Sequence, residues 1–338
     1  MRVVILHDEL PPDARPDEQD TLAQAKYVGE LLRSLGHDVS SLPLSLDLES
    51  AADALRRLAP DAVFNLVEAV GGQGRLIHLA PALLESLRIP FTGAGSEAMF
   101  LSTSKTLSKR CFEQAGLDTP RAYTRADLEA IVDNKSPDAF VPAEYIIKSV
   151  WEHASLGLNA DSVIHAPTAA DLLAALDARE PSLGHEAFAE QFIDGREFNV
   201  ALLEADQGVE VLPIAEMVFV DWPPGVPRIV GYDAKWAEHT FEYTNTVRRF
   251  DTAEPALARE LARVALCAWN AMSMRDYARV DVRVDARGKV WVLEVNANPC
   301  LSPDAGYHAA GARAGRNLAS AANCWITRFR GAPAALVR

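Results

Sequence analysis

The 338-residue sequence has no apolar run long enough to span a bilayer, only four cysteines, and few aromatic residues, which make up 7% of the chain. The first absence argues against a membrane protein, and residues 1–8 read as a first strand and not as a signal peptide. The four cysteines are scattered and form no Cys-x-x-Cys pair. They therefore favour reduced thiols and a cytoplasmic location over a disulfide framework or a zinc site.

Positive charge is also scarce, since the sequence contains 33 Lys and Arg but 47 Asp and Glu, which gives a net charge of −14. This excess argues against nucleic acid or an acidic membrane as a general partner. It does not argue against a small phosphorylated ligand, because a few local lysines and a divalent cation can hold phosphates in an acidic protein. No Gly-x-x-x-x-Gly-Lys-Ser/Thr motif occurs, which excludes a P-loop enzyme, and the histidines show no metal-ligand spacing.

The first part of the chain alternates strand-like and helix-like segments up to about residue 95, which predicts a small parallel α/β domain. Residues 8–20 are interpreted as a polar loop before a helix capped by Thr21 and Gln24. Glu68 follows the predicted buried strand at 61–66. Ligands gather at the carboxyl ends of parallel strands, so Glu68 is either a substrate contact or an exposed loop acid, and the sequence favours neither.

The most informative stretch is a predicted β-hairpin formed by residues 278–284 and 289–296. In the second strand, alternation places Glu294 and Asn296 on the face of the valines. Pairing of the two strands would put Asp281 across from Glu294 and Asn296. Two carboxylates and an amide oxygen are hard ligands suited to Mg²⁺ that carries nucleotide phosphates. The alternative, an edge hairpin with solvated acids, explains a charged residue within an apolar run poorly.

Three lysines accompany this hairpin. Lys148 ends an apolar strand, and Lys105 and Lys109 stand at the start of an earlier helix. A second apolar strand at 188–193 contains the acid Glu190. Lysines, an acid-bearing strand and a metal-binding hairpin together favour a site that grips an adenine nucleotide between two sheets.

With these motifs the sequence resembles the ATP-grasp enzymes, and within them the D-alanine–D-alanine ligase group, from about residue 60 to 310. The resemblance implies that Arg279, Asp281, Glu294 and Asn296 are the family's Arg-x-Asp and Glu-x-Asn residues. The last three would bind the metal. The nucleotide-binding residues that it implies are Lys105, Lys148, Glu190, Phe192, Ile193, Glu197 and Lys235. Arg279, Lys235 and Ser155, which lies in a phosphate loop at 152–157, would be catalytic.

The resemblance also implies an α/β, in places α+β, ATP-grasp fold. Its expected parts are a Rossmann-like N-terminal domain at 1–97, a central lid domain at 98–186, and a C-terminal domain at 187–338 with the metal and substrate sites. The expected cofactors are ATP and Mg²⁺, for which Mn²⁺ can substitute. The expected partners are small carboxylate and amine substrates, and the oligomeric state is left open, a homodimer being one alternative.

The departures from the family pattern concern the substrate residues. The first loop reads His7-Asp8-Glu9 in place of a glycine-rich segment, Cys300 replaces a glycine, and Ala305 stands near the family's serine. Candidate substrate residues are accordingly Glu9, Glu68, His153, Cys300 and Ser302. His153 is either a phosphate donor or a surface residue, and Cys300 is either a nucleophile or a small residue in the glycine's place.

The predicted function is therefore ADP-forming ligation of a carboxylate and an amine through an acyl-phosphate, on amino-acid or small-peptide substrates other than two D-alanines. The alternatives are D-alanine–D-alanine ligase itself and an ATP-grasp kinase that phosphorylates a hydroxyl. A non-catalytic nucleotide-binding protein fits less well, because all metal-ligand positions are present.

Overall fold

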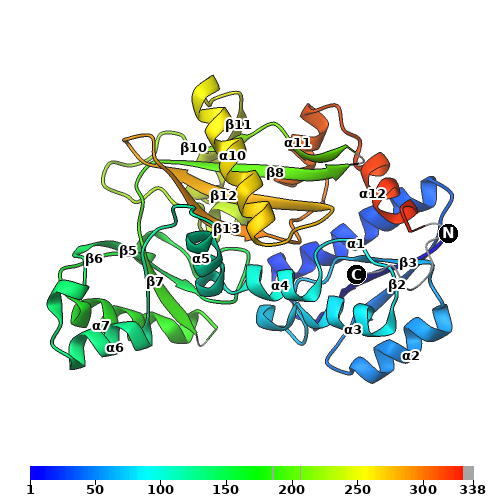
Figure 1. Ribbon diagram of the computed structural model, residues 1–338, viewed down its shortest axis with the longest axis horizontal. Helices are drawn as coiled ribbons and strands as arrows, with labels where there is room; N and C mark the ends of the chain where they lie inside the picture. The colour runs from blue at the N-terminus through cyan, green and yellow to red at the C-terminus, as the bar shows by residue number, and fades with distance from the viewer. Residues whose placement is uncertain (185, 206, 330–338) are drawn as a thin grey trace.

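The computed structural model describes residues 1–184, 186–205 and 207–329 and contains three β-sheets, each covered by helices (Figure 1). The N-terminal sheet has the strand order β2-β1-β3 and the central sheet the order β4-β7-β5-β6. The third sheet has the order β11-β10-β8-β12-β13, with β9 paired to β8.

The N-terminal sheet is parallel and consists of β1 (Arg2–Asp8), β2 (Asp38–Leu44) and β3 (Ala62–Asn65). Val3 and Ile5 of β1 pack in one hydrophobic cluster, and Val4 and Leu6 pack in another on the opposite face. Burial on both faces explains why β1 is a continuous apolar run. The helices of this unit are α1 (Pro16–Ser34), α2 (Leu48–Leu58) and α3 (Leu79–Leu87).

Helix α1 begins five residues earlier than the predicted Thr21 cap, so the prediction of a loop up to residue 20 is wrong. Pro16 is its first residue, where the fixed φ of proline and its missing N–H fit a helix start. Glu18 caps the helix, because its carboxylate accepts the backbone N–H of Arg15 at 2.7 Å. Thr21 and Gln24 are buried within the helix. The acids at the start of α1 are therefore held in a rigid first turn.

The central sheet is antiparallel and consists of β4 (Ala122–Thr124), β5 (Ala143–Ser149), β6 (Val163–Ala166) and β7 (Ala187–Gln191). Helices α6 (Arg125–Asp133) and α7 (Ala169–Arg179) cover it (Figure 1). Because β7 pairs with both β4 and β5, the boundary predicted after residue 186 moves to residue 191.

Two helices that the prediction assigned mainly to the central domain pack elsewhere. Met99 of α4 (Ser96–Thr103) and Phe112 of α5 (Lys105–Gln114) lie in the hydrophobic cluster of the C-terminal sheet. The central unit proper therefore starts after α5. Short 3₁₀ turns lie at Gly74–Leu76, Pro137–Ala139, Ala160–Ser162 and Glu180–Ser182.

The C-terminal sheet carries α10 (Pro255–Ala271) on one face (Figure 1). Residues of its other face line one cavity together with residues of the segment 220–245. That segment holds two short helices, α8 (Asp233–Trp236) and α9 (Phe241–Asn245). The strands are β8 (Arg196–Ala205), β9 (Gly208–Val211), β10 (Ala215–Phe219), β11 (Thr246–Phe250), β12 (Tyr277–Val284) and β13 (Val290–Asn296).

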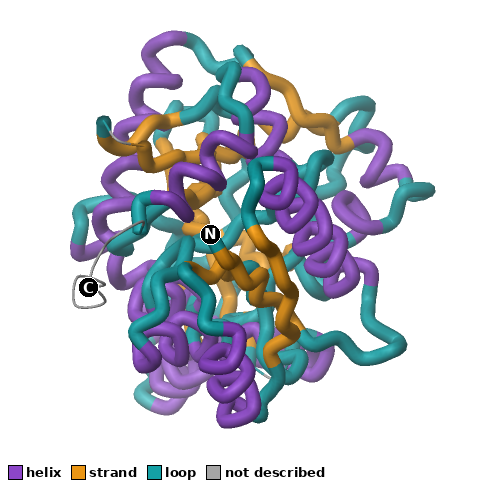
Figure 2. The backbone as a smooth tube through the Cα atoms, turned by 90° about the vertical axis from the view of Figure 1, so that its right-hand side faces the viewer, coloured by secondary structure: helices purple, strands orange, loops and turns teal. Residues whose placement is uncertain are grey.

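The last helices, α11 (Gly306–Arg313) and α12 (Leu318–Thr327), return the chain to the N-terminal unit. Trp325 packs against Phe64 of β3 and Tyr277 of β12, with ring centroids 6.2 and 4.6 Å apart. Arg328 forms an ion pair with the fully buried Asp276. The N-terminus lies near α12 at the right of Figure 1, and Figure 2 views the molecule from that side.

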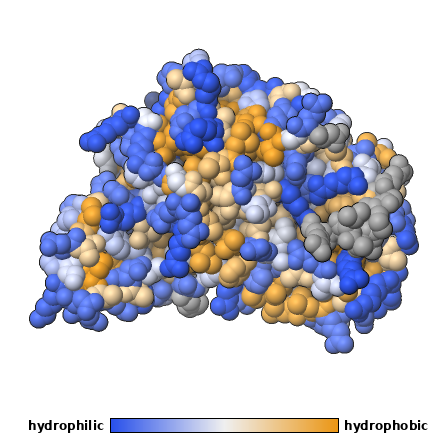
Figure 3. Space-filling view, viewed as in Figure 1, coloured by the Kyte–Doolittle hydropathy of each residue, from blue (hydrophilic) through white to orange (hydrophobic). Residues whose placement is uncertain are grey.

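On the face shown in Figure 3, hydrophilic residues form most of the periphery and hydrophobic residues gather near the middle. Within the described part of the chain, no helix combines the length and the apolar character needed to cross a membrane.

Candidate active site

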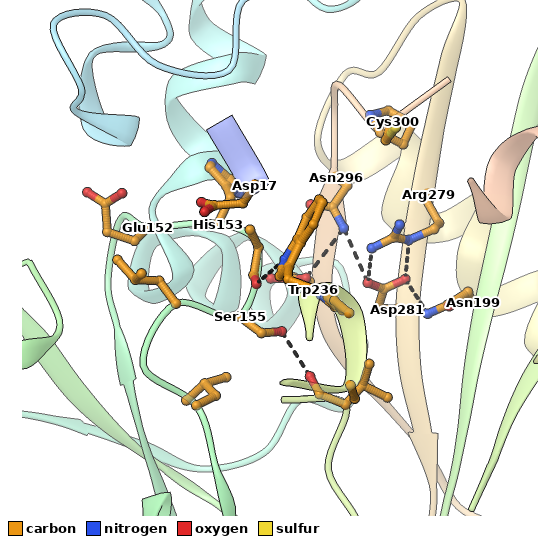
Figure 4. A pocket seen from close by; sticks show the side chains of 18 of the residues that line it. Asp17, Glu152, His153, Ser155, Asn199, Trp236, Arg279, Asp281, Asn296 and Cys300 are labelled. Atoms are coloured by element: carbon orange, nitrogen blue, oxygen red, sulfur yellow. Dashed lines mark hydrogen bonds and ion pairs between the residues drawn. The ribbon is translucent and has the colours of Figure 1, made fainter. Parts of the chain in front are cut away.

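A cavity of about 840 Å³ lies where the three units meet (Figure 4). Its walls come from the carboxyl ends of β1 and β3, the first turns of α1, the loop 152–156, the end of β7, and the open face of β12 and β13. Every predicted nucleotide, metal and catalytic residue lines this one cavity. They are Lys105, Lys148, Ser155, Glu190, Phe192, Ile193, Glu197, Lys235, Arg279, Asp281, Glu294 and Asn296.

The predicted hairpin of β12 and β13 is present, and Asp281 pairs with Glu294 across the ladder as expected. One detail of the prediction is wrong, because Glu294 does not share a face with Val292. A β-bulge between Asp281 and Val282 leaves Leu293 as the extra residue. Val292 therefore faces the core while Glu294 faces the cavity, since one added residue reverses the side-chain direction.

Asp281 is the centre of a hydrogen-bond network and is only 6% exposed. Arg279 donates to both of its oxygens, at 2.8 and 2.7 Å, and the Asn199 amide donates at 2.8 Å. The amide nitrogen of Asn296 lies 3.2 Å from Asp281 Oδ2 and 3.4 Å from Glu294 Oε1. A donor group thus occupies the point between the two carboxylates.

This arrangement fits a divalent cation. Turning the Asn296 amide by 180° would replace its nitrogen with its oxygen and complete a set of three hard oxygen ligands. Two acids and one amide leave coordination positions for phosphate oxygens, which is how Mg²⁺ is commonly held with a nucleotide.

The charges around Glu294 keep it ionised. Burial acts to raise the pKa of its carboxyl, but Lys105 and Lys235 outweigh burial and hold the pKa below its ordinary value. Burial in turn lowers the pKa of both lysines, and Glu294 counteracts that effect. Lys105 is positioned by a hydrogen bond from Nζ to the Glu152 carbonyl oxygen at 2.7 Å.

Glu190 forms a buried ion triad with Lys109 and Lys148, one lysine on each carboxylate oxygen. Lys109 also donates to the Thr119 hydroxyl at 2.8 Å and to the Pro120 carbonyl at 3.0 Å. Burial would raise the pKa of Glu190, but the two lysines lower it below the ordinary value. Both oxygens are therefore engaged, and the carboxylate positions the two lysines.

The loop at 152–156 is held by the segment 229–236. Ser155 Oγ donates to the Val230 carbonyl at 2.9 Å, and Trp236 Nε1 donates to the Ala154 carbonyl at 3.2 Å (Figure 4). His153 lies in the cavity wall, and its buried Nε2 has no hydrogen-bond partner among the described residues. Burial lowers its pKa to about 4, so the imidazole is neutral near pH 7. The surface-loop alternative for His153 is wrong.

The opposite end of the cavity is acidic. Asp8, at the end of β1, accepts the backbone N–H groups of Glu68 and Ala69 at 2.8 and 3.0 Å. Burial raises the pKa of Asp8 to about 7, and burial together with Asp8 raises that of Glu68 to about 8. The Tyr232 hydroxyl donates to Asp17 at 2.9 Å and links the segment 229–236 to α1.

Two predicted substrate residues do not line the cavity. Glu9 is exposed outside it, because Asp8 is the β1 residue that points inward. Ser302 is buried behind the wall, where its Oγ lies 3.3 Å from Asp20. Glu68 and Cys300 do line the cavity. Burial raises the pKa of Cys300, whose thiol donates to Asp20 at 3.0 Å, which argues against a thiolate nucleophile.

Sequence reasoning missed Asp8, Asp17, Asp20 and Arg248 in the cavity wall. The signal for the first of these was available, since Asp8 ends the first parallel strand, where ligands gather. The signal for Asp17 and Asp20 was Pro16, which marks a helix start and places both acids in its opening turns.

Comparisons with known proteins agree with this geometry. A family model described as the D-ala D-ala ligase C-terminus matches residues 141–321. The uncharacterized protein y4sG of Sinorhizobium fredii is 31% identical over 324 residues, covering 93% of this chain and 88% of that one. A D-alanine–D-alanine ligase of Aquifex aeolicus is 30% identical over 307 residues, covering 89% and 91%.

Solved structures resemble the fold over nearly the whole chain. A Bacillus anthracis D-alanine–D-alanine ligase complexed with ATP superposes with a TM-score of 0.70 at 17% identity, covering 97% of both chains. VanG D-Ala:D-Ser ligase of Enterococcus faecalis gives 0.72 at 16%, covering 97% and 99%. The predicted ATP-grasp fold is confirmed.

Proposed function

Because the chain belongs to the D-alanine–D-alanine ligase family of ATP-dependent carbon–nitrogen ligases, we propose that it joins two amino-acid or small-peptide substrates other than a pair of D-alanines. One substrate supplies a carboxylate that ATP phosphorylates. The amine of the other attacks the acyl-phosphate, forming an amide and releasing phosphate and ADP.

The observation that carries this proposal is that one cavity has a carboxyl-rich end and a lysine-rich end. The carboxyl-rich end, with Asp8, Asp17 and Glu68, suits the ammonium group of a substrate, because a bound cation would counteract the effect of burial on the pKa of Asp8 and Glu68 and favour their ionised forms. The basic end, with Lys105 and Lys148, suits the phosphates of ATP. An amino acid bound with its ammonium at the acidic end would direct its carboxylate toward the phosphates.

The residues at and near the basic end would each contact a different part of the nucleotide. Lys105 and Lys148 would neutralise phosphate charge, and the main chain at Phe192 and Ile193 would hold the adenine. Glu197, which accepts two hydrogen bonds from Arg283 at 3.1 and 2.8 Å, would face the ribose. Mg²⁺ held by Asp281, Glu294 and Asn296 would neutralise charge on the transferring phosphoryl group.

Arg279, Lys235 and Ser155 are proposed to act during the transfer itself. Asp281 fixes the guanidinium of Arg279 by two hydrogen bonds, and a fixed planar cation can stabilise the oxyanion of the tetrahedral intermediate. Lys235 lies on the short helix α8. The next residue of this helix, Trp236, donates a hydrogen bond to Ala154 in the phosphate loop that also contains Ser155. Closure of this segment would exclude water from the acyl-phosphate.

The substrate residues support a substrate pair different from two D-alanines. Cys300 and Ala305 line the cavity where the family pattern has a glycine and a serine. The acids at the other end come from β1 and α1, and no glycine-rich first loop is present. The residues proposed to bind the nucleotide match the family pattern, whereas those in the substrate wall differ from it. This combination favours a ligase whose substrate specificity differs from that of D-alanine–D-alanine ligase.

A hydroxylamine assay tests the proposal. Hydroxylamine traps an acyl-phosphate as a hydroxamate without the natural amine, so a panel of amino acids and small peptides with ATP and Mg²⁺ would identify the donor. We expect hydroxamate from at least one donor and little from D-alanine. Efficient D-alanyl-D-alanine synthesis would show that the substrates are those of the Aquifex relative. Phosphate transfer to a hydroxyl compound, without any hydroxamate, would support the kinase alternative.

A further inference from the structure

The phosphate loop at 152–157 has a backbone conformation that its residues disfavour. Ala154 and Ser155 have φ angles of 58° and 61°, and Gly157 just beyond them has 68°. This left-handed conformation suits glycine, but in an L-residue it brings Cβ too close to the following carbonyl oxygen. Among the described residues, no other two consecutive non-glycine residues have positive φ angles. Such a strained pair persists only where surrounding contacts hold it.

The contacts that hold this pair come from the segment 229–236. Trp236 Nε1 donates to the Ala154 carbonyl at 3.2 Å, and Ser155 Oγ donates to the Val230 carbonyl at 2.9 Å (Figure 4). The two hydrogen bonds therefore act on the two left-handed residues themselves.

The backbones of the loop and of this segment also meet at close range. The N–H of Tyr232 donates to the Leu158 carbonyl at 2.9 Å. A Cβ added at Gly231 would lie only 2.6 Å from the same carbonyl oxygen, so the approach requires a glycine at that position. Separation of the segment from the loop would break these contacts together with the hydrogen bonds to Ala154 and Ser155.

Hydrogen bonds within the loop do not replace those contacts. The N–H of Leu156 donates to the His153 carbonyl at 3.1 Å, and the N–H of Leu158 donates to the Ser155 carbonyl at 3.0 Å. Both join residues three apart, and bonds of this kind also form in turns whose central residues have negative φ angles. Without the segment 229–236, the loop can therefore relax to ordinary φ angles and keep bonds of its own.

Relaxation of the loop would change the basic end of the cavity. His153, Ala154, Ser155 and Leu156 all line the cavity, as does Lys235 of the segment 229–236. A change of φ at the two left-handed residues would redirect the N–H groups of the loop, and separation of the segment would withdraw Lys235. The arrangement proposed to bind phosphates needs both the docked segment and the left-handed loop.

We propose that the phosphate loop is a two-state element whose backbone strain opposes docking of the segment 229–236, and that a bound nucleotide supplies the interactions that complete the docked state. An empty site then favours the undocked segment, and nucleotide binding and docking strengthen each other. This inference rests on the proposed function, since it takes the nucleotide to bind at the basic end.

The test removes the strain at one residue of the loop. Glycine adopts the left-handed conformation without a steric penalty, so Ala154→Gly should favour the docked state. In the ligand-free protein, cutting by trypsin after Arg228 and Lys235 should slow by about three- to tenfold. The Kd for the ATP analogue AMP-PNP with Mg²⁺, measured by calorimetry, should fall by a similar factor.

Ala59→Gly is the matched control, because Ala59 is an alanine in the same left-handed conformation at the end of α2, outside the cavity. It should raise the melting temperature and leave both trypsin cutting and the Kd at wild-type values. Trp236→Phe removes one of the bonds that hold the loop and keeps an aromatic ring, so it should speed cutting and raise the Kd. Adding Ala154→Gly to Trp236→Phe should reverse part of both changes.

Unchanged or faster cutting in Ala154→Gly would overturn the proposal, because strain at this residue would then not oppose docking. Slower cutting with an unchanged Kd would refute the coupling to the nucleotide. A lower Kd that Ala59→Gly shares would also overturn the proposal, since general stability would explain it. If AMP-PNP binds to neither the wild type nor the variants, the nucleotide site of the proposed function fails, and cutting of the ligand-free proteins still decides whether strain opposes docking.

Discussion

The buried ion triad predicts a large effect of the substitution Glu190→Gln on stability. Glu190 is 2% exposed, and the side chains of its partners Lys109 and Lys148 are 5% and 15% exposed. Glutamine keeps the shape but removes the charge that two shielded lysines share. Breaking a buried ion pair by removing one partner costs about 3–5 kcal/mol, because it leaves an uncompensated charge.

The assay is thermal unfolding followed by circular dichroism without nucleotide. At roughly 2–4 °C per kcal/mol for a unit of this size, the melting temperature should fall by roughly 6–20 °C. Glu144→Gln, on the exposed face of the neighbouring strand β5, is the control and should stay within about 0.5 kcal/mol of the wild type. Adding Lys109→Met to Glu190→Gln should recover part of the loss, since one stranded cation is removed.

The result that would refute this reasoning is specific. If Glu190 read adenine directly and had no role in the free protein, Glu190→Gln would weaken ATP binding and leave the melting temperature unchanged. That outcome would show that the two lysines are solvated in solution and that the triad does not stabilise the central sheet.

Further predictions concern metal, nucleotide, lid and pH. Glu294→Gln should abolish ATP turnover while circular dichroism stays native, because the cation site loses a full charge, and unchanged phosphate release would remove Glu294 from that site. Lys148→Ala should raise the Kd for ATP by about one to two orders of magnitude in calorimetry, and wild-type affinity would exclude a phosphate contact. Residues 225–245 should be cleaved by protease without ligand and protected by an ATP analogue with Mg²⁺, whereas equal cleavage would mean that they do not close. The raised pKa of Glu68, about 8, means that the folded protein retains a proton that the unfolded chain loses near pH 4.5. Wild-type stability should therefore fall as pH rises from about 5 to 8, and Glu68→Gln should flatten that fall in melting curves; parallel curves would contradict the assigned pKa.

The hairpin of the metal site was predictable because its evidence is local. Alternating valines and a Gly-containing turn specify two strands, and an acid in each strand identifies the pair Asp281 and Glu294. The bulge at Leu293 was not predictable, since the strand keeps its apolar alternation and only pairing with β12 shows which residue is extra. The wrong prediction concerned only the sheet face on which Glu294 lies. The proposed metal ligands, Asp281, Glu294 and Asn296, are the same as before.

The acidic end was harder to predict because its residues are brought together by the fold. Asp17 lies in a stretch that reads as a loop until Pro16 is taken as a helix start, and its partner Tyr232 is far along the chain. For a similar reason, the sequence indicated where Glu190 lies but not which side chains its carboxylate contacts. A strand pattern shows that Glu190 is buried, but it does not show that Lys109 of another unit occupies one of its oxygens.

The return of α12 to the N-terminal unit has a consequence for how the chain folds during synthesis. Phe64 of β3 is synthesised long before the Trp325 ring of α12 that covers it. Until then, one face of the N-terminal sheet lacks part of its cover, and such exposed apolar surface invites aggregation. Complete burial of this face of the N-terminal sheet must therefore wait until α12 has been synthesised.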